Sequence, residues 1–273
     1  MKYIFFGTPD FAAIILEKLI KVGFIPEAVI CNPDRPVGRK KIITPPPTKI
    51  LAQKNNIKVL QPEVLDSSFK IQVSSFQPDF AIVAAYAQII PKEILDIPRL
   101  GTIGVHPSLL PKYRGSSPIQ TAILNGDEET GVSLYLMDEK MDHGTIIAQK
   151  VSSIQGVSFC ELYERLANLG VDLLIETLPK FLKNEITPLL QNESQATYTK
   201  KFITEDGRVD LGKDDPLLIE RKIRALNSEP GVFTFMDGKR VKLLEARISD
   251  GKVVITKIQT EGKKPQISSI LIN

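Results

Sequence analysis

The chain has 273 residues, enough for two domains of ordinary size, and its net charge is only +3. No apolar run approaches the ~20 residues that a membrane helix needs, and the apolar start is too short for a secretory signal. Cys31 and Cys160 stand far apart without a Cys/His cluster, which argues against a zinc site or a disulfide framework. We expect a reduced, cytoplasmic protein, without a membrane segment or a bound metal.

The first hundred residues alternate short apolar runs with amphipathic stretches. Helices are predicted at 10–22, where Asp10 can cap the first turn, and at 47–55. Short strands are predicted at 2–6, 27–31, 57–60, 80–85 and 102–106. This alternation predicts an α/β fold with an open, mostly parallel, Rossmann-like sheet. Ligands of such sheets bind where the carboxyl ends of strands open into loops, here 7–10, 32–41, 86–90 and 106–115.

The second half of the chain changes character after a long helix. Two strands at 132–137 and 145–151 and a helix at 158–182 precede a polar stretch, 188–203, that lacks periodicity. A helix at 216–225 and four short strands at 232–235, 239–246, 252–259 and 266–271 follow. We therefore predict a first domain over 1–190, a linker over 191–203 and a small β-rich domain over 204–273.

Charge is distributed unevenly between these parts. Residues 201–273 carry 14 Lys and Arg against 11 Asp and Glu, so they hold the whole positive excess. A mildly basic segment fits a nucleic-acid partner, although a solvated charged surface explains it equally well.

Histidine is scarce, with only His106 and His143 in the chain. Imidazole acid–base chemistry must therefore use one of these two residues or not occur. The motifs GxGxxG, GxxxxGK[ST] and GxSxG are absent, which argues against a dinucleotide site, a P-loop and a serine hydrolase. His106 ends an apolar strand at the predicted ligand edge, where a catalytic and a structural role are equally plausible. Asp142 is a natural carboxylate partner for it, but the residues alone do not select Asp142 over Asp138.

The loop 34–41 (DRPVGRKK) follows the second strand and holds four basic residues. It is either a solvated surface loop or an arm that contacts phosphates of RNA. The basic residues are Arg35, Arg39, Lys40 and Lys41.

Four segments resemble the methionyl-tRNA formyltransferase family of folate-dependent formyltransferases. They are GTPDFA at 7–12, PDRPVGRKK at 33–41, HPSLLPKYRGSSPIQ at 106–120 and MDEKMDHGTII at 137–147. Their order and spacing match over roughly residues 1–250, and His106 precedes Asp142 by 36 residues, as in that family.

The resemblance implies transfer of a formyl group from 10-formyltetrahydrofolate to the amine of initiator methionyl-tRNA. His106 would polarise or protonate the reacting centre, and Asp142 would orient it and assist proton removal from the amine. Arg39 would lead the 34–41 loop beside the acceptor stem, and the last domain would be an oligonucleotide-binding-like (OB-like) barrel that contacts tRNA. We expect no metal and a monomer. The implied folate-contacting residues are Ser108, Leu109, Leu110, Pro111, Tyr86, Gln88 and Ile90.

Two departures from the family pattern leave alternatives open. Gly104 stands where the family has an Asn that donates to the developing oxyanion, a donor worth about 2.7–4 kcal/mol elsewhere. The C-terminal domain is also shortened. An amino-sugar nucleotide acceptor, hydrolysis of formyl-folate, and a non-catalytic folate- or tRNA-binding paralogue are therefore the competing hypotheses.

Overall fold

A computed structural model describes residues 1–273 except 39, 228, 250 and 273. The chain divides into two compact units: unit 1 holds residues 1–114, 131–151 and 164–197, and unit 2 holds 115–130, 152–163 and 198–273. The sequence suggested continuous stretches, whereas the chain enters unit 2 three times. Helix α5 (Pro118–Asn125) packs on α7 (Pro216–Leu226) inside unit 2, a contact between distant segments that local sequence patterns do not reveal. The domain boundaries 1–190, 191–203 and 204–273 stay a prediction.

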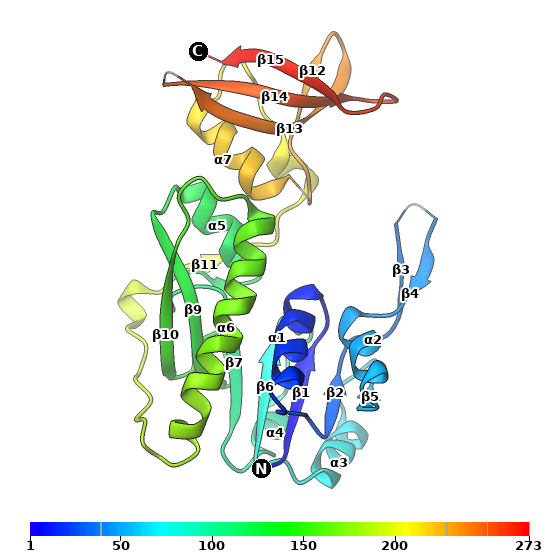
Figure 1. The fold of residues 1–273 in the computed structure, drawn as a ribbon, viewed down its shortest axis with the longest axis vertical. Helices are drawn as coiled ribbons and strands as arrows, with labels where there is room; N and C mark the ends of the chain where they lie inside the picture. The colour runs from blue at the N-terminus through cyan, green and yellow to red at the C-terminus, as the bar shows by residue number, and fades with distance from the viewer. Residues whose placement is uncertain (39, 228, 250, 273) are drawn as a thin grey trace. The chain divides into compact units, whose positions relative to one another are not determined.

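Unit 1 is built on a seven-stranded sheet with the strand order β10-β9-β7-β6-β1-β2-β5 (Figure 1). Strands β7, β6, β1, β2 and β5 run parallel, and β9 joins β7 antiparallel. The mostly parallel sheet predicted from the alternation of elements is thus confirmed. Its strands are β1 (Tyr3–Gly7), β2 (Ala28–Ile30), β5 (Lys58–Leu60), β6 (Phe80–Ala84), β7 (Thr102–His106), β9 (Glu129–Leu136) and β10 (Ile146–Ser153).

Alternate residues of the buried strands face two different helical layers. On one face, Ile4 and Phe6 of β1 join a core with α3 (Ser67–Ser75) and α4 (Lys92–Leu95). On the other face, α1 (Asp10–Lys21) and α6 (Phe159–Phe181) meet where Gly170 approaches Ile15 and Val105 (Figure 1). Helix α2 (Pro47–Lys54) packs on α1 and β5. Strands buried on both faces explain the continuous apolar runs in the sequence.

Several elements differ from the sequence predictions. Asp10 is the first residue of α1, and Pro9 occupies the N-cap position. Helices α3, α4 and α5 were missed, although Asp66 caps α3 through bonds from two backbone N–H groups and Pro118 opens α5, both ordinary helix-start signals. The 34–41 segment contains β3 (Arg35–Val37), which pairs antiparallel with β4 (Ile42–Thr44) just beyond it.

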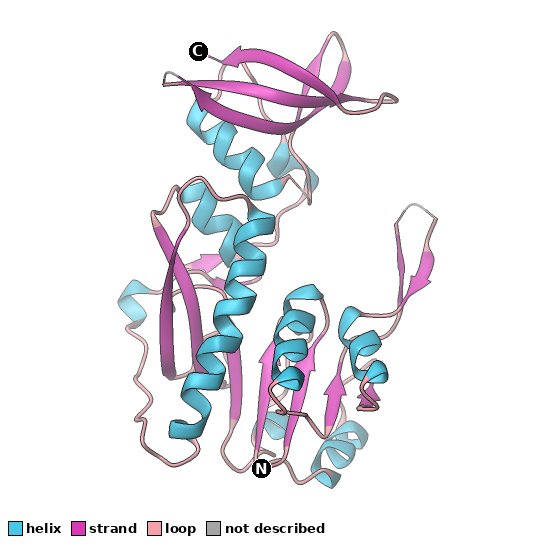
Figure 2. Cartoon of the chain, in the orientation of Figure 1, coloured by secondary structure: helices cyan, strands magenta, loops and turns pink. Residues whose placement is uncertain are grey.

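Unit 2 combines helix α7 with a four-stranded antiparallel sheet, drawn in magenta at the C-terminal end of the chain in Figure 2. Ile219 and Ile223 of α7 and Leu243 and Ile255 of the sheet are buried. The predicted β-rich C-terminal part is confirmed, whereas closure into an OB-like barrel stays a prediction. The strands of the sheet are β12 (Phe233–Met236), β13 (Lys239–Ser249), β14 (Lys252–Thr260) and β15 (Gln266–Ile272).

Short strands β8 (Arg114–Gly115) and β11 (Tyr198–Thr199) complete the fold. Within the described part of the chain, every helix is too short or too polar to cross a bilayer.

Candidate active site

The candidate site lies at the carboxyl edge of the parallel strands. β1, β2, β6 and β7 are neighbours in the sheet and end at Gly7, Ile30, Ala84 and His106. Because parallel strands end at the same edge, the four loops selected from the sequence meet there. His106 is the last residue of β7, and only 6% of its surface is exposed.

His106 faces Asp142 with one nitrogen and the protein backbone with the other. Its Nε2 lies 2.9 Å from the carbonyl oxygen of Tyr113, which only accepts, so Nε2 carries the hydrogen of this bond. Nδ1 is then the nitrogen that gains or loses a proton, and it lies 3.6 Å from Asp142 Oδ2. This separation exceeds a direct hydrogen bond, so proton transfer between the two groups would need a small movement or a bridging group. The geometry selects Asp142 over Asp138, while the chemical roles of both residues stay predictions.

Asp142 sits in a tight turn between β9 and β10. Its φ of 50° is left-handed, a conformation that Asp tolerates better than most residues. Gly144 is required two residues later, because a Cβ there would lie 2.8 Å from the carbonyl carbon of Leu136. His143 pairs with the other acidic residue of the turn, since its Nδ1 lies 2.6 Å from Asp138 Oδ2. The second acidic residue of the turn thus pairs with the second histidine.

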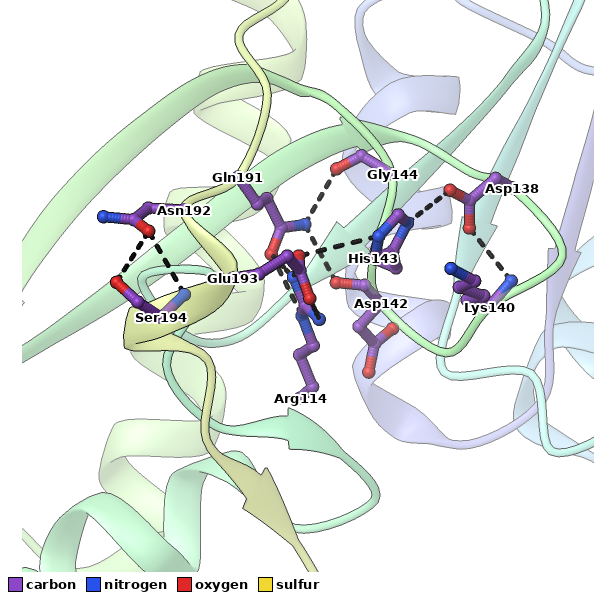
Figure 3. Close-up of polar contacts among 10 residues, drawn as sticks. All are labelled: Arg114, Asp138, Lys140, Asp142, His143, Gly144, Gln191, Asn192, Glu193 and Ser194. Atoms are coloured by element: carbon purple, nitrogen blue, oxygen red, sulfur yellow. Dashed lines mark hydrogen bonds and ion pairs between the residues drawn. The ribbon is translucent and has the colours of Figure 1, made fainter.

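A segment that we call the strap, residues 189–197, fixes this turn from outside (Figure 3). Gln191 donates from Nε2 to the carbonyl oxygens of Asp142 and Gly144, at 2.9 and 2.8 Å. Its Oε1 accepts from Arg114 Nε and Nη2, at 3.1 and 2.7 Å. Glu193 also accepts from the Arg114 guanidinium, which has no exposed surface. The Arg114 bonds hold the pKa of Glu193 below its usual value.

The strap also holds the segment that follows His106. The backbone N–H of Tyr113 donates to Thr197 Oγ1 at 2.8 Å, and that of Arg114 to the Thr197 carbonyl at 2.9 Å. At its other end, Leu189 exchanges two backbone hydrogen bonds of 2.8 Å with Ile146. The strap therefore connects the loop after His106 with the turn that carries Asp142.

The expected folate-contacting segment 108–111 is anchored on β9. Buried Ser133 donates to the Ser108 carbonyl at 2.7 Å and accepts from the Leu110 N–H at 3.0 Å. Ser108 and Leu110 are buried, whereas Leu109 and Pro111 are partly exposed. The side chains at 108 and 110 thus serve the structure, and Leu109 and Pro111 keep surface for a ligand.

The other expected folate residues lie on the loop after β6. Ile90 belongs to the core beside α4, and Gln88 donates to Asn32 Oδ1 and the Pro62 carbonyl, both at 3.2 Å. Tyr86 contacts Phe6 edge-on, and burial raises the pKa of its hydroxyl. Among the described residues, this buried hydroxyl finds no hydrogen-bond partner. An unpaired buried donor at the ligand edge suits a bound molecule with polar groups.

The basic segment 34–41 lies on the exposed β3–β4 hairpin. Arg35 pairs with Glu63 at 2.6 Å, and both side chains are mostly exposed. Lys40 and Lys41 are exposed, whereas Arg39 lies outside the described residues. Among the described basic residues of the segment, Arg35 is therefore ion-paired, and Lys40 and Lys41 are exposed.

Three supports of His106 and Asp142 were not evident from the sequence. They are the Tyr113 carbonyl, the strap residues Gln191 and Glu193, and Tyr135, which covers Gly104. Tyr135 alternates with buried Leu134 on β9, but only the register of the sheet shows what it covers. No cluster of three or more potential metal ligands occurs among the described residues.

Two family models match the chain: "Formyl transferase" over residues 1–178 and "Formyl transferase, C-terminal domain" over residues 201–253. Methionyl-tRNA formyltransferase of Chloroflexus aurantiacus is 41% identical over 251 residues, 91% of this chain and 81% of its own. The enzyme of the same name from Enterococcus faecalis is 43% identical over 244 residues, 89% and 78% of the two chains.

Solved structures show the same fold at low sequence identity. HypX from Aquifex aeolicus in complex with tetrahydrofolic acid has a TM-score of 0.66 and 19% identity, over 97% of this chain and 45% of that one. Methionyl-tRNA formyltransferase from Clostridium thermocellum has a TM-score of 0.63 and 19% identity, over 95% and 98% of the two chains. On the strength of its family matches and its curated relatives, the chain is a transferase enzyme that belongs to the methionyl-tRNA formyltransferase family.

Proposed function

We propose that this protein transfers the formyl group of 10-formyltetrahydrofolate to the α-amine of initiator methionyl-tRNA in translation initiation. The observation that carries the proposal is the pair of His106 Nδ1 and Asp142 Oδ2, 3.6 Å apart at the ligand edge of the sheet. Relatives that are 41% and 43% identical bear the name of this activity.

The reaction itself needs little from the protein beyond positioning and proton transfer. The co-substrate supplies an activated formyl group: the amine nitrogen bonds to the formyl carbon, the bond from that carbon to N10 breaks, and a proton passes from the amine to N10. Asp142 accepts a proton from the attacking amine through Nδ1 of His106 or directly, and His106 returns it on the leaving side. The bond from Nε2 to the Tyr113 carbonyl keeps the ring in one orientation and one tautomer.

The folate site is proposed along the loops after β6 and β7. Tyr86 supports this placement because its buried hydroxyl lacks a partner among the described residues, and Leu109 and Pro111 because they retain exposed surface. The solved HypX structure holds tetrahydrofolic acid on the same fold. Lys40 and Lys41 on the β3–β4 hairpin, with Arg35 and Arg39, are proposed to contact the phosphates of tRNA.

The test is formyl transfer by the purified protein with 10-formyltetrahydrofolate and charged initiator tRNA. Replacing His106 with Ala should lower the rate about 10²- to 10⁴-fold, the usual contribution of a general acid–base group. His143→Ala is the matched control, because this chain has only two histidines and His143 pairs with Asp138 instead. Equal rates for the wild-type protein and His106→Ala would contradict the proposal.

The same assay separates the competing hypotheses. Loss of the formyl group without any dependence on added tRNA would indicate formyl-folate hydrolysis, and transfer only to an amino-sugar nucleotide would identify that acceptor class. A monomeric state and a cytoplasmic location are further parts of the proposal, tested by light scattering and by cell fractionation.

A further inference from the structure

Gly104 and Tyr135 are directly opposite each other in the antiparallel pair of β7 and β9. Side chains of opposite residues stand on the same face of a sheet. A Cβ built on Gly104 would lie 2.5 Å from Tyr135 Cζ and 2.9 Å from its Oη, closer than real atoms approach. The tyrosine ring therefore fills the space above residue 104, and a glycine is required beneath it.

The ring ends at the candidate active site. Tyr135 Oη donates to Asp142 Oδ1 at 2.7 Å, while the other oxygen of the same carboxylate faces His106. Only 3% of Tyr135 is exposed, and burial, followed by the negative charge of Asp142, raises the pKa of its hydroxyl well above the usual value. The hydroxyl consequently keeps its proton and stays a donor over the working pH range.

Gln191 in the strap holds Asp142 through its backbone carbonyl, and the Tyr135 hydroxyl holds its carboxylate. A short hydrogen bond from a neutral hydroxyl to a carboxylate is of the stronger kind, and it fixes one oxygen. With Oδ1 fixed, Oδ2 is directed at Nδ1 of His106.

We propose that Tyr135 is a positioning residue for Asp142, and that Gly104 and Tyr135 act as one unit in which the β9 ring replaces a side chain at position 104. This inference rests on the proposed function for its kinetic test. On this proposal, Gly104 lacks a side chain because the tyrosine ring fills that space, so the glycine does not indicate a lost active site.

The kinetic test uses Tyr135→Phe, which removes only the hydroxyl and keeps the ring over Gly104. We expect kcat for formyl transfer to fall about 10- to 100-fold, as for a lost hydrogen bond to a charged group, with both KM values within about twofold. Tyr3→Phe is the matched control: Tyr3 is 1% exposed and donates to the Phe24 carbonyl at 2.8 Å, at the start of β1 and thus at the opposite edge of the sheet. Equal kcat values for the two variants would overturn the proposal.

A second readout does not depend on the reaction. With only two histidines in the chain, the ring resonances of His106 are separable by NMR. At about pH 8, Tyr135→Phe should move the His106 resonances while Tyr3→Phe leaves them in place, because the facing carboxylate shifts only in the first variant. If the His106 resonances stayed in place in Tyr135→Phe, the positioning role would be refuted, whatever the activity of the protein. If the wild-type protein transferred no formyl group, only the proposed function would be refuted.

The unit itself is tested by a double-mutant cycle of thermal stability. Gly104→Ala adds one methyl group that collides with the ring, so it should lower Tm in the wild-type background. In a Tyr135→Leu background, the shorter side chain leaves room, and the same change should lower Tm far less. Equal losses in the two backgrounds would show that the ring does not occupy this space.

Discussion

Gln191 connects the buried Arg114 to the turn that carries Asp142, so its replacement by Ala should affect both stability and rate. The change removes two hydrogen bonds from a guanidinium without exposed surface and two donations to turn carbonyls. Bonds to charged groups contribute about 1.5–3 kcal/mol each and neutral ones about 1, but Glu193 still pairs Arg114, so we expect a net loss of about 3 kcal/mol.

For a unit of this size, that loss corresponds to a decrease in Tm of about 6–12 °C, measurable by calorimetry or circular dichroism. Asn192→Ala is the matched control, since the neighbouring Asn192 is exposed and its side-chain oxygen accepts from the nearby Ser194 N–H and hydroxyl at 3.2 and 2.8 Å (Figure 3). Its Tm should change by less than about 2 °C.

Gln191→Glu separates stability from positioning. The carboxylate still accepts from Arg114, but it presents an oxygen to the carbonyls of Asp142 and Gly144 and repels them. We expect this variant to retain more stability than Gln191→Ala and yet to lose kcat at least tenfold, because the turn moves. If Gln191→Ala and Asn192→Ala had the same Tm, the strap would not hold the turn, and this prediction would be refuted.

Three further predictions concern neighbouring groups. Arg114 lowers the pKa of Glu193, so the stabilising contribution of this carboxylate is present above the unfolded pKa of about 4.3 and is lost as the pH falls through the lower folded pKa. The difference in Tm between the wild-type protein and Glu193→Gln should therefore be clear at neutral pH and vanish in acid. A difference that stays constant with pH would contradict this prediction. Ser133→Ala removes the hydroxyl that pairs with the Leu110 N–H and the Ser108 carbonyl, so it should lower the free energy of unfolding by about 2 kcal/mol and raise KM for the folate. The control is Ser75→Ala at an exposed position. An unchanged KM would show that the 108–111 segment does not take part in folate binding. Replacing Lys40 and Lys41 with Ala should raise KM for tRNA and leave KM for the folate unchanged. The slope of the logarithm of the tRNA binding constant against the logarithm of salt concentration should fall by about one for each phosphate that no longer contacts a lysine. An unchanged slope would exclude the hairpin from the tRNA site.

Much of the fold followed from local patterns. The apolar runs that became β1, β6 and β7 are buried on both faces of the sheet, and a strand covered on two sides must be apolar throughout its length. The parallel arrangement then placed His106 at the carboxyl edge, since parallel strands share that edge. The sequence also pointed to Asp142, although the residues alone left Asp138 equally eligible.

The tertiary structure decided what lies opposite what. The choice of Asp142 depends on the turn after β9, where a left-handed residue aims one carboxylate at His106 while Asp138 pairs with His143. The strap looked like an unstructured linker because its polar residues have no periodicity, yet they bond across the fold to Arg114 and the turn.

Gly104 shows the difference most clearly. In the sequence, Gly104 only marks the absence of a hydrogen-bond donor. In the sheet it leaves space for Tyr135, which lies 31 positions further along the chain but directly opposite Gly104 in the register. Local periodicity is encoded by neighbours in sequence, and contacts between distant strands depend on register, which only the folded chain fixes.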